Sequence, residues 1–477
     1  MKNKNIHIII APLLFIILNI IPPFEGLNNF DMSVLSILVW VTYWWATEAV
    51  SLYVTSLLPM ILFPIFTTIS AKTISTGYAH PLIFLVLGGS LFAIALERTR
   101  LNERIALQII NTIGFSKRKI ILSLSIAIAF VSMWISNASA TIAMLPIALT
   151  VLAEIQHQTK TQDKAFATCM LLTLAHSSSI GGMSTLIGTP PNAVLASQAK
   201  TLGGVDVSFL DWLVVGLPVS IISLMILYFM MTRVLYKIED TDLSSNSTAA
   251  LKKQLADLGT LNKEQKILIC LFAVMIFMLL FKNTEFVKTI LSVNGKFSDS
   301  GIILGIGVLL FTINNAKGEK ILTWDVVKHK IPLGVLLLIG GGISLAIALK
   351  KTNLLLIVGS YFAALGIFPV ITIIVLIALI TSFLTEVNSN TATSIILIPI
   401  TWSIASTLNI DPMLMISMVA LSASSAFMLP TATVPNAIVC SSGFIEVKDM
   451  IKSGIWLNIT IAPTIALTVY AIFTYVR

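Results

Sequence analysis

The sequence predicts an all-α polytopic membrane protein made of two homologous halves. Its 477 residues are 56% hydrophobic and only 11% charged, whereas soluble domains carry about 25% charged residues. Long apolar runs are separated by short polar segments, as expected of membrane-spanning helices. In addition, the segment SMWISNASATIAMLP at residues 132–146 is similar to TEVNSNTATSIILIP at residues 385–399. In the middle of each segment is a short polar stretch, Ser136–Ala138 in the first and Ser389–Thr391 in the second, which we call the first and second tips. Polar stretches of this kind inside apolar chain are typical of a transporter.

The internal repeat has two parts. An offset of 253 positions takes Asn137 to Asn390, within the two similar segments. An offset of 244 positions takes the motif GTPPN at 188–192 to ATVPN at 432–436. A period of about 250 residues is far too long for a solenoid. We therefore expect two homologous halves, with a binding site where the halves meet.

Charge and cysteine content exclude several classes of protein. The net charge of +8 is spread over polar segments, without a basic cluster that carries interleaved aromatic residues, so we expect no nucleic-acid partner. The excess of Lys and Arg instead indicates loops retained on the cytoplasmic side. The three cysteines, Cys169, Cys270 and Cys440, lie in or beside apolar runs and form no CxxC pair. Such a set predicts neither a disulfide framework nor a metal site.

Residues 1–66 are predicted to form the N-terminal spans of a scaffold. Residues 6–21 are apolar and follow Lys2 and Lys4, and no small-residue cleavage site of a signal peptide comes after them. We interpret them as a retained first span with a cytoplasmic N-terminus. Apolar residues then dominate from 33 to 66, which is more than one span of about 20 residues needs. Two spans broken near Thr47-Glu48 are expected, and Glu48 either forms an interfacial turn or has a binding role.

Residues 67–236 are expected to form the first repeat. A span at 82–96 leads to the basic segment ERTRLNERIALQIINTIGFSKRK, whose apolar residues recur at helical spacing. An amphipathic arm on the cytoplasmic side, or a solvated basic loop, fits this pattern. A re-entrant hairpin near 120–155 carries the first tip. An apolar run at 165–196, broken at 188–192, and a span at 212–236 complete the half.

The second repeat is expected at residues 267–477, after a polar cytoplasmic linker at 237–266. The linker contains the segment LSSNSTAA, whose Asn-Ser-Thr sequon has no meaning on that side of the membrane. The predicted order follows the first half: spans at 267–281, 302–313 and 332–349, a re-entrant hairpin near 370–408, a run at 413–437 broken at 432–436, and a span at 455–475. Between equivalent spans the chain crosses the membrane an odd number of times, which predicts inverted repeats and a C-terminus outside.

The two tips carry small polar residues in place of charges. Hydroxyl and amide groups beside helix N-termini, which carry partial positive charge, form a neutral site that favours anions. Carbonyl, hydroxyl and amide oxygens at such breaks also suit a small cation. No Arg or Lys lies within ten residues of either tip, so helix dipoles and bound cations would neutralise an anionic substrate. One such tip could simply hold neighbouring helices together, but two copies at matched offsets favour a coupled transport site.

Several motifs in the sequence resemble those of the divalent anion/sodium symporter family. They are the paired tips, SIGGMSTLIGTPPN at 179–192, TATVPNA at 431–437 and WWATEAV at 44–50. The resemblance covers nearly the whole chain. The family includes bacterial and animal transporters of succinate, malate, fumarate, citrate and sulfate. It implies about eleven transmembrane helices plus two re-entrant hairpins, a scaffold and a transport domain in each protomer, a homodimer and an elevator-type movement.

The resemblance also implies a set of binding residues. One sodium site would use Ser132, Ser136, Asn137 and Gly188, and the other would use Thr385, Asn388, Asn390 and Ala432. The substrate carboxylates would contact Ser136, Asn137, Thr189, Ser389, Asn390, Thr391 and Thr433, with Pro191 and Pro435 shaping the walls. Two positions depart from the family pattern, because Ala138 lacks a hydroxyl and Val434 stands where proline is usual.

The resemblance predicts a secondary active transporter of the cell membrane that imports a C4-dicarboxylate such as succinate, malate or fumarate together with sodium. Sodium ions would be the coupling ions, and no other cofactor is expected. An exchanger, a proton-coupled carrier, or a sulfate or tricarboxylate transporter on the same fold are alternatives. A membrane enzyme is not expected, because the sequence has no HExxH motif and the tips carry no acid–base dyad. His176 and Glu386 lie near the tips and serve either structural hydrogen bonding or a proton relay.

Overall fold

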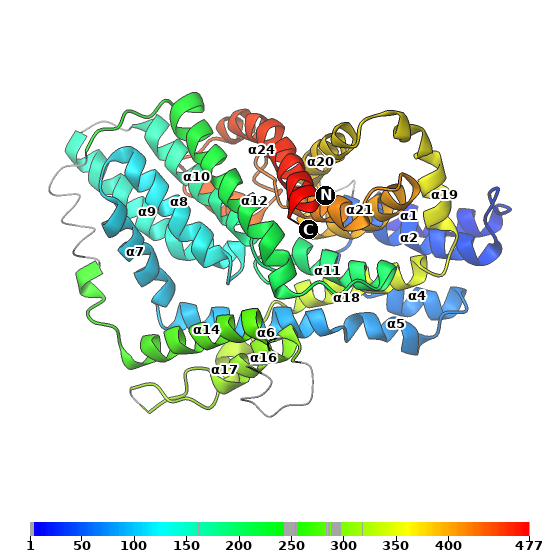
Figure 1. The fold of residues 1–477 in the computed structure, drawn as a ribbon, viewed down its shortest axis with the longest axis horizontal. Coiled ribbons are helices and arrows are strands. Elements are labelled where there is room, and N and C mark those ends of the chain that lie inside the picture. Colours follow the sequence, from blue (N-terminus) through cyan, green and yellow to red (C-terminus); the bar gives the residue numbers. More distant parts are fainter. Residues whose placement is uncertain are drawn as a thin grey trace.

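In the described part of the chain, the protein is built from helices joined by short connections (Figure 1). The structure is a computed structural model that describes residues 4–159, 163–242, 255–282, 297–316 and 318–476, with the single residues 253, 284 and 287. Within these ranges no β-strand forms. Five helices there are long and apolar enough to cross a membrane, or six if one bent pair counts as a span. The all-helical, multi-pass prediction is confirmed, and the predicted count of eleven spans stays a prediction.

The N-terminal segment forms four helices, α1 (Lys4–Ile20), α2 (Asn29–Thr47), α3 (Leu52–Thr55) and α4 (Leu58–Phe66). The break predicted near Glu48 is present, because Glu48 ends α2 with a left-handed φ of 47°. The second expected span stays a prediction; in this region the structure has the two short helices α3 and α4. Pro59, near the start of α4, favours a new helix start there. The carbonyl of Ser56 in the gap accepts a hydrogen bond from the Tyr78 hydroxyl at 2.5 Å.

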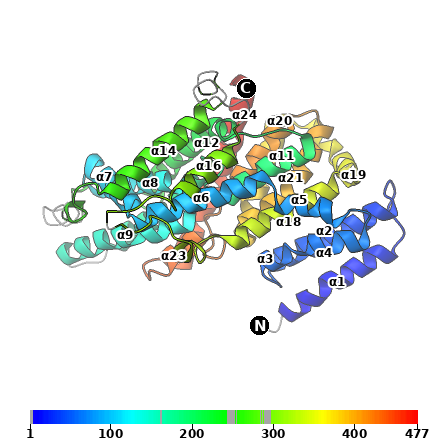
Figure 2. The ribbon, with the colours of Figure 1, turned by 90° about the horizontal axis from the view of Figure 1, so that it is seen from below.

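Helix α6 (Pro81–Arg98) runs through the middle of the molecule and continues from α5 (Ala71–Tyr78) (Figure 2). It packs closely on α16 (Asp299–Leu309), because Gly88 lacks a side chain where the two backbones meet. A Cβ on Gly88 would lie 2.7 Å from the Leu304 nitrogen. The equivalent Gly341 lies in α18 (Leu333–Leu349), where a Cβ would lie 2.6 Å from the Ser56 carbonyl oxygen. The repeated glycines therefore serve the same purpose in both halves.

The basic segment after α6 forms the predicted amphipathic helix, α7 (Leu101–Ile113). Its apolar residues Leu101, Leu107 and Ile110 are buried. They are covered by protein, since α7 packs on α8 (Lys117–Ser132). On its polar side, Arg104 donates hydrogen bonds to the carbonyls of Leu258 at 2.6 Å and Gly259 at 2.9 Å. Helix α7 therefore contacts protein on its apolar face, through α8, and on its polar face, through Arg104.

Both predicted hairpins are helix pairs with the expected bounds. The first consists of α8 and α9 (Asn137–Thr159), and the second of α20 (Val370–Val387) and α21 (Asn390–Thr407). Figure 1 shows the two pairs on opposite sides of α12 (Phe209–Phe229) and α24 (Val447–Tyr475). Helix α24 begins at Val447, earlier than the predicted residue 455. A short π-helical segment, η1 (Met230–Leu235), continues α12 and completes the predicted span at 212–236.

The two broken helices are present, but their breaks begin earlier than predicted. Helix α10 (Lys164–Gly182) ends before Met183, and α11 starts at Pro190 (Pro190–Gly203). In the second half, α22 (Pro412–Ala423) ends before Ser424, and α23 (Val434–Cys440) follows. The motifs GTPPN and ATVPN therefore mark the end of each break and the restart of the helix. Pro favours this position because it has no backbone N–H to leave unpaired.

The second half also departs from the expected bounds in its first spans. Helix α14 (Lys263–Phe281) starts inside the predicted linker, because Asn262 and Gln265 form a capping box at its N-terminus. Helix α16 ends at Leu309 rather than at 313, where the Leu310 carbonyl accepts a hydrogen bond from the Leu322 amide at 3.1 Å. The linker segment LSSNSTAA lies outside the described residues. Short helices α17 (Trp324–Val327), α19 (Leu354–Tyr361) and η2 (Ala363–Ile367) complete the chain.

The hairpins join the two halves of the sequence. Helix α8 packs on α10 of its own half, while α9 packs on α23 of the other half. The second half is arranged in the same way, since α21 packs on both α22 and α11. The packing of α11 on α21 includes a hydrogen bond from the Gln198 amide to the Ile395 carbonyl at 3.3 Å. Each hairpin is therefore held partly by the broken helix of the opposite half.

A larger side chain at Gly88 is expected to separate α6 from α16. Gly88→Val places methyl groups against the Leu304 backbone, and overpacking of this kind costs about 1–3 kcal/mol. We expect a lower midpoint of thermal unfolding in detergent, followed by size-exclusion chromatography. Gly305→Val on α16 is the control, because nothing lies within 4 Å of its added Cβ. Equal midpoints for the two variants would contradict the predicted close packing.

Candidate functional site

The first tip brings together three of the residues predicted to bind sodium. Ser132 ends α8 and Asn137 begins α9. In the amide orientation that satisfies its neighbours, the Asn137 nitrogen donates to Ser132 Oγ at 2.7 Å and to the carbonyl of Gly188 at 3.3 Å. A Cβ on Gly182 would lie 2.4 Å from the Asn137 amide, so only glycine fits there. Ser132, Asn137 and Gly188 thus form one cluster of hydroxyl, amide and carbonyl groups.

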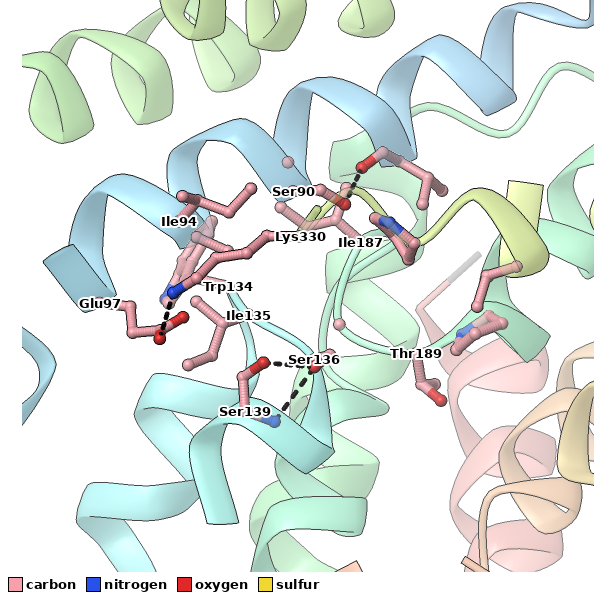
Figure 3. Close-up of a pocket in the computed structure, with 17 residues that line it drawn as sticks. Ser90, Ile94, Glu97, Trp134, Ile135, Ser136, Ser139, Ile187, Thr189 and Lys330 are labelled. Carbon is pink, nitrogen blue, oxygen red and sulfur yellow. Dashed lines mark hydrogen bonds and ion pairs between the residues drawn. The ribbon is translucent and has the colours of Figure 1, made fainter. Parts of the chain in front are cut away.

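Ser136, the fourth predicted member, points away from this cluster. Its Oγ accepts from the Ser139 backbone nitrogen at 3.1 Å and lies 2.9 Å from Ser139 Oγ. It therefore caps the N-terminus of α9 and faces the open side of the tip (Figure 3). The tip is fixed to the first break by Thr185, whose hydroxyl donates to the Met133 carbonyl at 2.6 Å.

The second tip pairs an equivalent hydroxyl and amide, but the hydrogen bond runs in the opposite direction, from the Thr385 hydroxyl to the Asn390 oxygen. The Thr385 hydroxyl lies 2.8 Å from Asn390 Oδ1 and 2.8 Å from the carbonyl of Ala423. By sequence offset, Thr385 and Asn390 correspond to Ser132 and Asn137. Asn388 instead accepts a hydrogen bond from the Ser389 nitrogen at 2.9 Å. In the part of the chain that the structure describes, no hydrogen bond joins Ala432 to the Thr385–Asn390 pair.

Two asparagines stabilise the two helix breaks by donating hydrogen bonds to backbone carbonyls. Asn192 Nδ2 donates to the carbonyls of Gly182, Met183 and Thr185 at 3.1, 3.2 and 2.7 Å. Asn436 Nδ2 donates to the carbonyls of Ala426 and Leu429, both at 3.1 Å. Gly182 and Thr185 correspond to Ala426 and Leu429 at the offset of 244. These amides satisfy carbonyl groups that the interrupted helices leave without partners.

Glu386 anchors the second break by a different contact. Its carboxylate accepts hydrogen bonds from the backbone nitrogens of Phe427, Met428 and Leu429 at 2.6, 3.0 and 3.2 Å. The Asn458 amide on α24 donates to the same carboxylate at 2.8 Å. A carboxylate surrounded by donors in this way stabilises the broken backbone. Of the two roles considered for Glu386, these contacts correspond to structural hydrogen bonding.

His176 lies at the contact between the two halves. It is fully buried on α10, and its ring meets the Phe427 ring edge-on, with centroids 4.9 Å apart. Phe427 belongs to the second break, and its backbone nitrogen is one of those that donate to Glu386. His176 therefore packs one broken helix against the other.

A cavity of about 260 Å³ opens beside the first tip (Figure 3). One wall carries Ser136, Ser139 and Thr189. The facing wall comes from α6 and from the turn before α18, and carries Glu97 and Lys330. These last two are the charged side chains among the described residues that line the cavity, and they form an ion pair with Nζ and Oε1 2.6 Å apart. The cavity thus has walls from both halves of the sequence.

Only some of the binding residues predicted in the first half line this cavity. Ser136, Gly188 and Thr189 do so, whereas Ser132, Asn137 and the buried Pro191 do not. The predicted residues of the second half do not line this cavity; they are Thr385, Asn388, Ser389, Asn390, Thr391, Ala432, Thr433 and Pro435. Val434, the departure from the family pattern, is 58% exposed. Ala138 is not among the lining residues, while its neighbour Ser139 is.

Several residues of the site are missing from the sequence-based set. Asn192 and Asn436 had a signal, because they end the paired motifs GTPPN and ATVPN. No sequence pattern pointed to Glu97 and Lys330, because the two residues are far apart in the sequence and lie outside both tips. No Arg or Lys lies within ten residues of either tip in the sequence, but the fold brings Lys330, which is distant in sequence, to the cavity of the first tip.

Comparison with known proteins identifies the family. The chain matches the sodium:sulfate symporter transmembrane region over residues 2–476. The chain belongs to this family of symporters. It is 35% identical to the sodium-dependent dicarboxylate transporter SdcS of Staphylococcus saprophyticus, over 98% of this chain and 91% of that protein. It is 36% identical to the SdcS protein of a Staphylococcus aureus strain, over 99% of this chain and 92% of that protein.

A solved structure shares the fold at low sequence identity. The YdaH transporter of Alcanivorax borkumensis superposes with a TM-score of 0.56 at 12% identity, covering 85% of this chain and 88% of that one. Family membership confirms the resemblance to the divalent anion/sodium symporters and the prediction of a transporter rather than an enzyme. The repeated Ser-Asn tips of this symporter therefore lie in a transport fold.

Removal of the Glu386 carboxylate is expected to destabilise the second break. Glu386→Ala leaves three backbone nitrogens and the Asn458 amide without their acceptor. Because hydrogen bonds to charged groups contribute about 1.5–3 kcal/mol each, we expect a clear fall in the thermal midpoint in detergent and a smaller fall for Glu386→Gln.

Glu446→Ala serves as the control for the Glu386 variants. Glu446 is a half-exposed carboxylate paired with Lys164 and Lys448, so its loss should leave the midpoint unchanged. A Glu386→Ala protein with the wild-type midpoint would show that this carboxylate does not support the break.

Proposed function

We propose that this symporter imports a C4-dicarboxylate such as succinate, malate or fumarate together with sodium across the cell membrane. The observation that carries the proposal is the repeated cluster of neutral oxygen and amide groups at the two tips, Ser132 with Asn137 and Thr385 with Asn390. Relatives at 35% identity over nearly the full length are sodium-dependent dicarboxylate transporters, which supports the same substrate and ion here.

Two sodium sites would account for the matched design of the tips. Hydroxyl, amide and carbonyl oxygens are the ligands that small hard cations prefer. No group of three or more His, Cys, Asp or Glu side chains suited to a metal occurs in the described part of the chain. We assign the first sodium to Ser132, Ser136, Asn137 and Gly188 and the second to Thr385, Asn388, Asn390 and Ala432. The carbonyl of Ala432 would have to approach the second tip when sodium binds.

Bound sodium would also offset the electrostatic cost of moving a dianion into the cell against an inside-negative membrane potential. Moving one negative charge inward against the membrane potential costs about 2.3 kcal/mol per 100 mV. Two sodium ions cancel the charge of a dicarboxylate, and a third makes uptake driven by the potential. Sulfate carries the same double charge, and the family description includes it. Sulfate, a tricarboxylate, proton coupling and anion exchange are therefore outcomes that the transport experiments below separate.

We further propose the architecture expected for the family. Two inverted repeats would place equivalent tips on opposite sides of the membrane midplane, and the exchange of helix contacts between α9, α23, α11 and α21 supports such a pairing. The N-terminal spans and α6 would form the scaffold, and the hairpins with the broken helices would form a transport domain that moves as an elevator in each subunit of a homodimer. The N-terminus would be cytoplasmic and the C-terminus outside. The basic segment at α7 supports this orientation.

Loss of the Asn390 side chain is expected to abolish uptake. Asn390 is assigned contacts to both substrate and sodium, and its Oδ1 lies 2.8 Å from Thr385. Asn390→Ala should give no uptake of labelled succinate in proteoliposomes while the purified protein keeps the wild-type size-exclusion profile. Near-normal uptake by this variant would move the binding site away from the second tip.

Sodium should be required for uptake, with a Hill coefficient above one. Ser132→Ala and Thr385→Ala each remove a hydroxyl from one tip cluster. We expect both variants to raise the half-saturating sodium concentration more than the half-saturating succinate concentration. Labelled uptake at varied sodium in proteoliposomes measures both values. If succinate exchanges equally well in choline without sodium, when counter-substrate is inside, the protein is an exchanger.

A further inference from the structure

The wall of the cavity that faces the first tip carries one ion pair. Glu97 lies in the last turn of α6, and Lys330 lies in the turn between α17 and α18. The backbone nitrogen of Lys330 donates to the Val327 carbonyl at 2.9 Å, which fixes the turn. Figure 3 shows the Lys330 side chain reaching across the cavity wall to Glu97, opposite Ser136 and Ser139. A residue from each half of the sequence therefore supplies this pair.

Lys330 is the source of full positive charge in the cavity. The tip itself offers the hydroxyls of Ser136, Ser139 and Thr189, which are neutral. A dianion has two carboxylates, and a single tip can satisfy one of them with hydroxyls and the N-terminus of α9. The second carboxylate then lies in a space where Lys330 is the available cation. Ammonium–carboxylate hydrogen bonds are among the strong ones.

The Lys330–Glu97 ion pair can open at small energetic cost, so that Lys330 can bind another carboxylate. The side chains of Lys330 and Glu97 are 42% and 46% exposed, and pairs that remain in contact with water add little to stability. Lysine has a flexible stem and three donors that rotate freely. An incoming carboxylate can therefore replace Glu97 as the partner of Lys330 at small cost. Glu97 regains Lys330 when the anion leaves.

We propose that Lys330 binds the distal carboxylate of the substrate when the first tip faces this cavity, and that Glu97 is its competitor when the cavity is empty. This inference rests on the proposed function for the identity of the anion. It makes Lys330 a specificity-determining residue that favours dianions over monoanions. Because Lys330 lies outside both tips, its contribution belongs to the conformation in which this cavity is open. The basic segment next to Glu97 places that side in the cytoplasm.

Opposite effects of the two partners provide the test. Full-length variants are reconstituted with known orientation, and the half-saturating anion concentration is measured separately on each side. Lys330→Gln should raise it about 10-fold on the cytoplasmic side, as expected for one charge-assisted hydrogen bond, with less than about a 2-fold change outside. Glu97→Gln should lower it on the cytoplasmic side, because Lys330 loses its competitor. Lys330→Arg should retain most of the wild-type affinity.

A second ion pair two residues away supplies the control. Lys328 pairs with Asp325 at 2.8 Å and does not line the cavity, so Lys328→Gln should behave as wild type on both sides. In wild type, butyrate should compete far less well than succinate from the cytoplasmic side, and Lys330→Gln should reduce this discrimination. A thermal midpoint near that of wild type for each variant shows that folding is unaffected.

The outcomes separate this inference from the proposed function. Succinate, citrate and sulfate are tested in parallel, and the variants are then compared on the anion that wild type transports. Opposite shifts for Lys330→Gln and Glu97→Gln on sulfate alone support the role of Lys330 while overturning the dicarboxylate proposal. Shifts in the same direction, equal shifts on both sides, or no shift for Lys330→Gln would mean that the pair is structural, and the inference would be wrong.

Discussion

Unpaired backbone groups at the two helix breaks are the constraint on which this structure depends. Residues 183–189 and 424–433 interrupt helices inside an apolar protein, and the buried carbonyl and amide groups freed there need partners within the protein. Asn192 and Asn436 each donate to carbonyls seven and ten positions earlier in the chain. Because every carbonyl bound in this way keeps its direction, the breaks have defined geometry and can present other backbone oxygens to an ion.

The two halves solve the same problem with different side chains. In the first, the Trp212 indole donates to the Met183 carbonyl at 3.0 Å, and a Cβ on Gly216 would lie 2.5 Å from that oxygen. In the second, Gly454 approaches the Phe427 carbonyl equally closely, at 2.4 Å for an added Cβ, while Glu386 accepts from the amides beyond it. Helices α12 and α24 therefore support equivalent breaks. The first break therefore has an indole donor beside it, whereas the second has a carboxyl group that accepts from its backbone nitrogens.

In the proposed function, the neutral tips and the Glu97–Lys330 ion pair both contribute to recognition of the anion. Hydroxyl and amide groups at the tips suit both a cation and a carboxylate, since they can accept and donate. A fixed positive charge there would compete with sodium. The neutral tips of this chain are thus consistent with coupling to a cation, and Lys330 lies on the facing wall, away from the Ser132–Asn137 cluster. In the proposed binding mode, its charge would act on the substrate without occupying the ion site.

The sequence by itself determined the helical membrane fold, the family, and the correspondence of Ser132 with Thr385 and of Asn137 with Asn390. It also predicted hairpins near 120–155 and 370–408, where the structure has helix pairs at 117–159 and 370–407. These features depend on local apolar runs and on a repeat visible along the chain. Only the tertiary structure decided where each break starts, because that depends on the carbonyls that Asn192 and Asn436 reach. It also brought Glu97 next to Lys330, and it placed the first tip, without the second, on the open cavity. Contacts between side chains so distant in sequence arise from helix packing, which no local pattern records.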